Sequence, residues 1–242
     1  MQKGKCLIGT SGWYYRHWQG RFYPNTLSKD KLLPFFSRYF NTVELNNSFY
    51  RLPEEKVVLA WRKKTPKGFL FAVKASRFIT HIKRLDNLGD SLKLFLGRMG
   101  SLGEKMGPLL YQLPPSMKKD AKRLARFLKR LPQKQRYVIE FRHLSWLDKE
   151  IFSLLKQFNV AHCIISKPDF PIAVETTADF SYIRMHGGSR LYRSNYSRAE
   201  LSKWAGIINR LLKSGLDTYV YFNNDACAYA VKNALSLKKL LS

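Results

Sequence analysis

Short apolar runs rich in β-branched and aromatic residues recur along the whole chain. They begin near Cys6, Thr42, Phe69, Pro108, Arg136, Ala161, Phe180 and Thr218. Almost purely apolar runs of this kind are typical of strands that are buried on both faces of a parallel sheet. They recur every ~20 to 40 residues, which leaves room for one helix and its loops between successive strands.

The intervals between the runs carry helical patterns, with one exception. Apolar residues recur at helical spacing over 119–131, with lysines and arginines facing away. Ser197 begins an S-x-x-E capping box, which predicts a helix over 201–213. The interval 167–179 contains two prolines and no helical period, so we expect an irregular crossover there.

Eight strand-and-crossover units in 242 residues predict a single (β/α)8 TIM barrel that spans residues 1–242. An open, doubly wound sheet fits eight such units less well, and no linker rich in Pro, Gly or Ser divides the chain. In a TIM barrel the active site lies at the carboxyl ends of the strands. The polar residues that end each run are therefore the candidates for chemistry.

Charge is the most unusual feature of the composition. The chain has 43 Lys and Arg against 17 Asp and Glu, a formal net charge of +26, while 45% of its residues are hydrophobic. The hydrophobic content is that of a globular protein. The charge favours an anionic small molecule or nucleic acid as partner, and a basic surface that is merely well solvated is the alternative.

Cysteine usage and the start of the chain bear on location. The three cysteines, Cys6, Cys163 and Cys227, form no C-x-x-C pattern, which favours a reducing compartment. Residues 1–5 lead directly into an apolar run and leave no room for a signal-peptide core. No window approaches 18 apolar residues, so no membrane partner is expected and the predicted location is cytoplasmic.

Glu44 is the sharpest candidate for chemistry, because a carboxylate inside the apolar run TVEL is costly to bury unless it is paired. It is interpreted as a general base or a metal ligand, or as one half of a buried salt bridge with Lys74 or Arg184. Lys74, Arg142 and Arg184 bring three cations to the same mouth. With Glu44 and Glu140 they form a structural ion-pair ring, or they bind a phosphate or carboxylate while a glutamate transfers protons.

His186 ends the seventh run and is the strongest histidine candidate for acid–base work, with a hydrogen-bonded structural role as the alternative. The predicted catalytic residues are thus Glu44, Glu140 and His186. The glycines that follow His186 suit a phosphate-binding loop or a simple turn. The predicted substrate-binding residues are Trp13, Asn46, Lys74, His81, Gln112, Arg142, Arg184, Asn223 and Asn224.

No metal and no cofactor are predicted. A metal site would require Glu44, Glu140, His186 or Asp225 to converge, and three nearby cations would repel a divalent ion. The chain has no H-E-x-x-H pattern, no G-x-x-x-x-G-K-[ST] loop and no G-x-G-x-x-G turn.

At these residues the sequence resembles a known family. The segments GTSGWYYRHWQGRFYP, FNTVELNNSFYRLP, FAVKASRFITHIKRL, GPLLYQLPPS, VIEFRHLSW, YIRMHG and VYFNND are similar to those of the YecE-like proteins, domain of unknown function family 72. The resemblance runs from about Ile8 to Ala234 and implies a TIM barrel. It also implies a likeness to metal-dependent sugar isomerases and abasic-site endonucleases, the analogy on which nucleic-acid binding has been suggested for the family.

The chain departs from the family pattern at two places. Ser166 stands where members tend to carry an aspartate, and Cys227 and Ala228 follow the NND motif where members often have a glycine.

A strand-end enzyme site for an anionic, phosphate-bearing ligand is therefore the leading prediction. The alternative is a nucleic-acid-binding protein without catalysis. It would use the aromatic loop over 13–23 and a basic helix face. That face comprises Lys118, Lys119, Lys122, Arg123, Arg126, Lys129 and Arg130.

Overall fold

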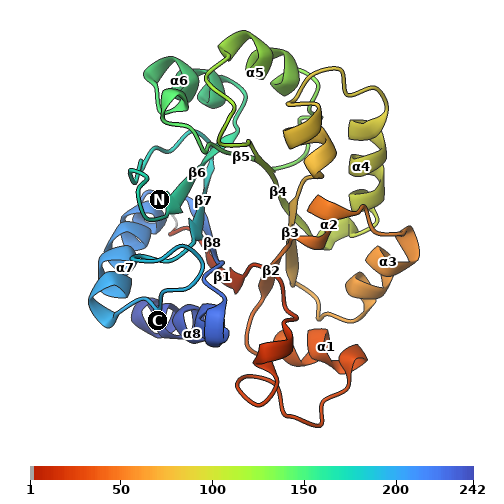
Figure 1. Cartoon of the computed structure of the whole chain (residues 1–242), viewed down its shortest axis with the longest axis vertical. Coiled ribbons are helices and arrows are strands. Elements are labelled where there is room, and N and C mark those ends of the chain that lie inside the picture. The colour runs from red at the N-terminus through yellow and green to blue at the C-terminus, as the bar shows by residue number, and fades with distance from the viewer. Residues whose placement is uncertain (1–2) are drawn as a thin grey trace.

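The computed structural model describes residues 3–242, so Met1 and Gln2, on which part of the signal-peptide prediction rests, lie outside the described residues. All eight apolar runs form strands (Figure 1). The strands are β1 (Cys6–Thr10), β2 (Thr42–Leu45), β3 (Leu70–Lys74), β4 (Met106–Gln112), β5 (Tyr137–Glu140), β6 (Ala161–Ser166), β7 (Phe180–Met185) and β8 (Asp217–Phe222).

The strands form one parallel sheet in the order β1-β8-β7-β6-β5-β4-β3-β2, which brings β1 and β2 to its two edges. These edges meet at a parallel bridge between Ser11 and Glu44, where Gly12 N donates to Glu44 O at 2.8 Å. A Cβ atom on Gly9 would lie 2.3 Å from Thr42 O, so only glycine permits this approach. The sheet closes as the predicted TIM barrel.

Helices surround the strands in Figure 1. They are α1 (Leu32–Phe36), α2 (Asn47–Tyr50), α3 (Glu55–Lys63), α4 (Ser91–Gly100), α5 (Ala121–Leu128), α6 (Lys149–Gln157), α7 (Arg198–Lys213) and α8 (Tyr229–Leu241). The capping box of Ser197 and Glu200 is confirmed at the start of α7. The helix predicted over 119–131 is shorter than expected, because Asp120 caps it and accepts from Arg123 N. The crossover over 167–179 contains no helix, as expected.

Two apolar clusters build the core. The larger cluster lies between the strands and the helices, and the smaller one fills the barrel interior with residues such as Val138, Tyr182 and Tyr221. Since side chains alternate along a strand, Glu140 and Arg184 share the inward face with Val138 and Tyr182. The inward face is therefore apolar below and charged at the carboxyl ends of the strands.

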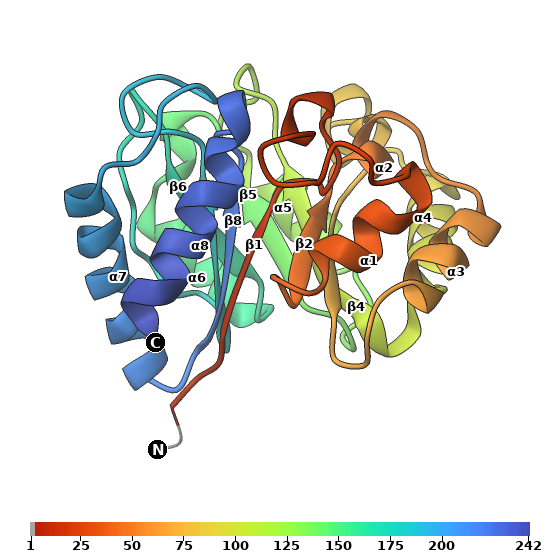
Figure 2. The same cartoon turned by 90° about the horizontal axis from the view of Figure 1, so that it is seen from below.

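Figure 2 shows the barrel from the side, with the loops that follow the strands at one end and both labelled chain termini at the other. The candidate residues all come from the loop end. Among residues 3–242, no helix is long and apolar enough to cross a membrane.

Candidate functional site

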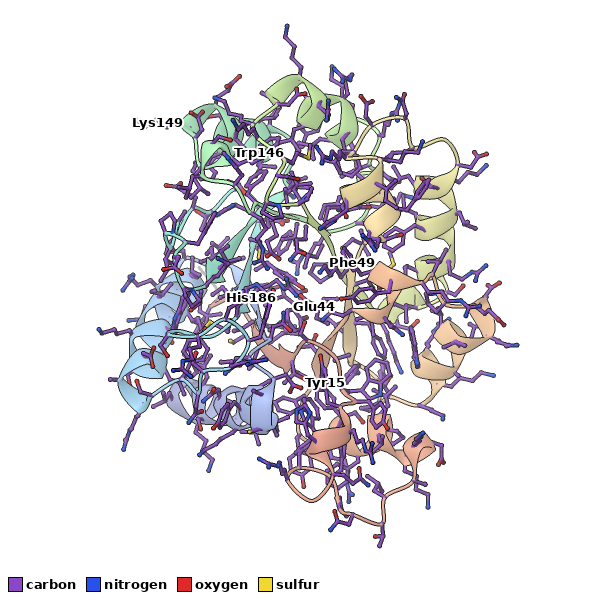
Figure 3. The ribbon with its side chains drawn as sticks, viewed as in Figure 1. Tyr15, Glu44, Phe49, Trp146, Lys149 and His186 are labelled. Carbon is purple, nitrogen blue, oxygen red and sulfur yellow. The ribbon has the colours of Figure 1, made fainter. Side chains whose placement is uncertain are left out.

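A buried ion-pair network occupies the barrel beneath the loops. Arg184 Nη1 donates to Glu140 Oε2 at 2.6 Å, and its Nη2 donates to Glu44 Oε1 at 2.7 Å. Arg142 Nε forms a further ion pair with Glu140 Oε1. Arg184, Glu44 and Glu140 are wholly buried, and Figure 3 places Glu44 inside the ring of strands. The alternative of a salt bridge between Glu44 and Arg184 is thus the arrangement present, and Lys74 is not the partner.

Glu44 has hydrogen-bond donors on both carboxylate oxygens. Ser11 Oγ donates to Oε1 at 2.5 Å, alongside Arg184, and the Tyr182 hydroxyl donates to Oε2 at 2.6 Å. Burial alone would raise the pKa of Glu44, but the Arg184 guanidinium and these hydrogen bonds hold the pKa below its usual value. Glu44 is therefore a carboxylate at neutral pH, stabilised by Arg184, Ser11 and Tyr182.

Glu140 is held in the same way by three donors. Gln112 Nε2 donates to Oε1 at 3.0 Å, and the two arginines bind the remaining positions. Burial would raise the pKa of Glu140, yet Arg142 and Arg184 lower it well below its usual value. Neither glutamate carries a proton at neutral pH, so neither is ready to donate one.

His186 is wholly buried and contacts the network from above Arg184. Arg142 Nη2 lies 3.0 Å from His186 Nε2, and the side-chain amide of Asn223 lies 3.2 Å from Nδ1. A guanidinium and an amide nitrogen both offer only N–H donors, so each ring nitrogen faces a donor, and Nε2 also lies 3.5 Å from Glu140 Oε1. Burial, followed by the charge of Arg184, lowers the pKa of His186 to about 3, so the ring stays neutral.

Lys74 differs from the other cations of the site. It ends β3 and is half-buried, and in the described part of the chain no acidic side chain forms an ion pair with it. Its Nζ lies 3.9 Å from the centre of the Phe49 ring. Burial and then the charge of Arg184 lower the pKa of Lys74 to about 7, against the opposing pull of Glu140 and Glu44.

His81 packs against the Phe49 ring, which Lys74 also contacts. It belongs to a π-helical turn over Phe78–Ile82, and its ring stands edge-on to that of Phe49 with 5.0 Å between centroids. Its Nδ1 is 2.9 Å from Thr80 Oγ1. Burial and the nearby charge of Lys74 lower the pKa of His81 to about 4, so it is a neutral imidazole beside the amine. Turns of π-helix are rare in proteins overall, and those that occur are often found at functional sites.

Of the remaining candidates, Asn46 has a side-chain oxygen available to a ligand, whereas Asn224 and Trp13 are engaged in contacts within the protein. Asn46 Nδ2 donates to Ser11 Oγ, while Asn46 Oδ1 is buried with no partner in residues 3–242, which leaves it free to accept from a ligand. Asn224 is directed elsewhere: its amide donates to Ser194 O at 2.9 Å and to Asn233 Oδ1 at 2.8 Å, tying the loop before α7 to α8. Trp13 packs edge-on against Trp61 of α3, with 5.5 Å between ring centroids.

The aromatic loop and the basic helix are partly occupied by contacts within the protein. Trp18 and Tyr23 are buried beneath the loop. On the helix side, Lys119, Arg123 and Arg126 form ion pairs with neighbouring carboxylates.

Asp225, the remaining carboxylate considered as a metal ligand, lies at the edge of the mouth and is already paired. Its Oδ1 accepts from Trp18 Nε1 at 2.7 Å, and its Oδ2 is 2.9 Å from His17 Nε2. Within residues 3–242 no group of three or more His, Cys, Asp or Glu side chains is arranged to hold a metal ion.

Two residues of the site were not predicted from the sequence. Tyr182 lies two positions before Arg184, so strand alternation places it on the same inward face and identifies it in retrospect. Phe49 carried no such signal, because it lies in α2, a single helical turn that follows β2 and that no periodicity predicts. The label in Figure 3 places Phe49 beside the barrel mouth.

Two known proteins are similar to this chain in sequence. YunF of Bacillus subtilis, a UPF0759 protein, is 27% identical over 269 aligned positions that cover 97% of this chain and 94% of YunF. YecE of Escherichia coli K12, also a UPF0759 protein, is 36% identical over 115 residues, or 47% of this chain and 42% of YecE.

Solved structures give the same result. The crystal structure of a DUF72 family protein from Thermotoga maritima aligns with a TM-score of 0.90 at 28% sequence identity. The alignment covers 98% of this chain and 99% of the Thermotoga chain. A DUF72 family protein from Enterococcus faecalis shares the fold, with a TM-score of 0.82 at 19% identity; it covers 98% of this chain and 95% of its own. The model of the family described as "Protein of unknown function DUF72" matches residues 7–242. The chain therefore belongs to the DUF72 family.

Proposed function

We propose that the carboxyl ends of the strands form a site that binds a small anionic ligand, and that Lys74 exchanges protons with it. The observation that carries this proposal is the charge balance of the site. Arg142 and Arg184 are balanced by Glu44 and Glu140 through ion pairs, whereas Lys74 has no acidic partner among the described residues. An ammonium group here leaves one positive charge that a ligand can neutralise.

Exposure supports the same assignment. Gln112, Arg142 and Asn223 are half-buried like Lys74, and they overlie the wholly buried network. A ligand at the mouth meets these amides and cations first. The proposal thus changes the role of Arg184 from a clamp on the ligand to a fixed scaffold, because its guanidinium already binds two carboxylates.

Proton exchange is assigned to Lys74 and not to Glu44, Glu140 or His186. The pKa values of the two glutamates are lowered from their usual values and the pKa of His186 lies near 3, so all three keep one protonation state around neutral pH. Lys74, with a pKa of about 7, changes state within this range. General acid–base catalysis is most effective when the pKa lies near the operating pH.

Isothermal titration calorimetry with inorganic phosphate and a mononucleotide tests the proposal. A bound anion raises the pKa of Lys74, so at pH 8 the protein should take up about one proton per ligand. Titrations in two buffers of different ionisation enthalpy measure that uptake. Lys74→Met should lose the uptake and weaken binding by about tenfold or more, while the exposed control Lys122→Met should retain both. Equal binding by Lys74→Met would refute the proposal.

The formal net charge of +26 favours a second candidate, nucleic-acid binding without catalysis. Fluorescence-anisotropy titration with single- and double-stranded DNA and RNA, at low and near-physiological salt, separates it from the first. Charge reversal at Lys122, Arg126 and Lys129 should abolish binding if the outer helix is responsible. Lys74→Met should leave such binding unchanged.

A further inference from the structure

We propose that the Lys74 amine is a nucleophile that forms an imine with carbonyl compounds bearing a carboxylate or a phosphate. This inference rests on the proposed anion site and names the substrate class of that site. It stands on the geometry of Lys74: a half-buried amine at the end of a barrel strand, with no acidic partner in the described residues and an aromatic ring on one side.

The surroundings of Lys74 keep part of its population uncharged. The pKa of about 7 means that about half of the molecules carry a free amine at pH 7, against about one in 2,500 for a lysine with an ordinary pKa. Burial and the adjacent arginine cause this, and both are established routes to a nucleophilic lysine. The face of the Phe49 ring attracts the ammonium form, so burial and Arg184 lower the pKa of Lys74 in spite of this contact.

A second buried lysine, Lys105, shows which hydrogen-bond acceptors are missing around Lys74 in the described part of the chain. Lys105 is 6% exposed, and its Nζ donates to the carbonyl oxygens of Arg62 and Thr65, both at 2.6 Å, and to Thr65 Oγ1 at 3.1 Å. Those three acceptors satisfy the Lys105 nitrogen with hydrogen bonds. Lys74 has no comparable set of acceptors among residues 3–242, so burial there favours the free amine.

The reaction is an addition followed by loss of water. The Nζ lone pair attacks the carbonyl carbon, the C–N bond forms, and the former carbonyl oxygen takes a proton to give a carbinolamine. Water then leaves with that oxygen while Nζ gives up a proton, so one amine and one carbonyl yield one imine and one water. The two protons that the amine loses are the two that the departing oxygen carries away as water.

The charge balance explains why the carbonyl compound should be anionic. With Lys74 neutral, Arg142 and Arg184 cancel Glu44 and Glu140. A protonated imine restores one positive charge to the site, and an acidic group on the same ligand neutralises it. A carbonyl compound without that group leaves the charge uncompensated in a half-buried position.

Reductive trapping tests the inference with a matched pair of ketones. The protein is incubated at pH 7 with pyruvate or with hydroxyacetone, which has a hydroxymethyl group in place of the carboxylate. Cyanoborohydride then reduces any imine, and intact mass and peptide mapping locate the adduct. We expect one adduct per chain at Lys74 with pyruvate, formed at least tenfold faster than with hydroxyacetone and suppressed by inorganic phosphate. Lys105 and the exposed Lys122 serve as internal controls.

Lys74→Arg separates this inference from the proposed anion site, because arginine keeps the positive charge but does not form the imine. The variant should still bind inorganic phosphate by calorimetry and should give no adduct. Wild type that binds phosphate but is labelled at Lys74 no faster than at Lys122 would overturn the inference and leave the anion site standing. Absence of phosphate binding as well would overturn both. Equal labelling by the two ketones would overturn the requirement for an acidic group.

Discussion

Replacing Lys74 with methionine should stabilise the protein, although the side chain belongs to the proposed site at the barrel mouth. The folded state lowers the pKa of this lysine from 10.5 to about 7, which means that the ammonium form is less favourable in the barrel than in the unfolded chain. Methionine keeps a long apolar stem against Phe49 and removes the charge. Sites built for function are often costly to stability in this way.

The magnitude follows from the same pKa. At 1.36 kcal/mol per pH unit, the change from 10.5 to about 7 corresponds to roughly 5 kcal/mol at pH values below 7. Lys74 retains some contact with solvent, and the lost attraction between ammonium and ring offsets part of the gain. We therefore expect Lys74→Met to raise the free energy of unfolding by roughly 2–3 kcal/mol at pH 6.

The gain must also depend on pH in one direction. Between pH 7 and pH 10.5 the unfolded chain binds more protons at this site than the folded protein, so the stability of wild type rises with pH through this window. The advantage of Lys74→Met is complete below pH 7 and is lost as the pH approaches 10.5. Urea denaturation at pH 6, 8 and 10, followed by tryptophan fluorescence, measures the stability gain of Lys74→Met. With the dependence of stability on urea concentration unchanged, the gain appears as a shift of the denaturation midpoint.

Lys105→Met is the matched control, with the opposite expected sign. It removes the donor to the buried carbonyl oxygens of Arg62 and Thr65 and should destabilise by about 1–3 kcal/mol for each acceptor left without a partner. If Lys74→Met destabilises the protein at pH 6, or if its gain does not change between pH 6 and pH 10, the reasoning about Lys74 is wrong.

Three further substitutions test other parts of the structure. Glu140→Gln should lower the free energy of unfolding by about 3–5 kcal/mol in urea denaturation, because it removes the carboxylate shared by the buried Arg184 and the half-buried Arg142; a loss below 1 kcal/mol would contradict that role. Gly9→Ala should lower the thermal midpoint by several degrees in calorimetry, since its Cβ would overlap the Thr42 carbonyl, and an unchanged midpoint would show that the strands can separate freely. Ala228→Gly should stabilise by up to about 1 kcal/mol in urea, because Ala228 has a φ of 61°, and destabilisation would indicate that this backbone is not strained.

The barrel could be predicted from the sequence because its signals are local. Each strand is indicated by the apolar residues of its own short segment, and the Ser197 capping box marks the start of α7 within a single stretch of sequence. The charged layer was predicted as a set of residues, with the partner of Glu44 left open between Lys74 and Arg184. Which carboxylate binds which cation depends on strand register, and Arg184 reaches Glu44 and Glu140 only because the closed barrel brings β2, β5 and β7 around one interior.

Two adjacent asparagines show the same limit of prediction from sequence. Asn223 and Asn224 are equivalent in the sequence, yet Asn223 contacts His186 and Asn224 contacts Asn233 of α8. Successive side chains leave a strand in opposite directions, so adjacent positions seldom serve one site. The distinct state of Lys74 likewise depends on what surrounds it in three dimensions, since its pKa responds to Arg184, more than a hundred positions later in the chain.

The seam between β1 and β2 links the site to the opening motions of the barrel. Seven neighbouring strand pairs are joined by parallel pairing within the strands, with one register shift between β3 and β4, whereas β1 and β2 meet at the bridge of Ser11 and Glu44. Sub-global opening of a protein begins where the fewest backbone hydrogen bonds must break. The Gly12 amide should therefore exchange its hydrogen sooner than the strand amides opposite it. Because the Glu44 side chain also binds Arg184, we expect such openings to loosen the site while most of the barrel stays folded.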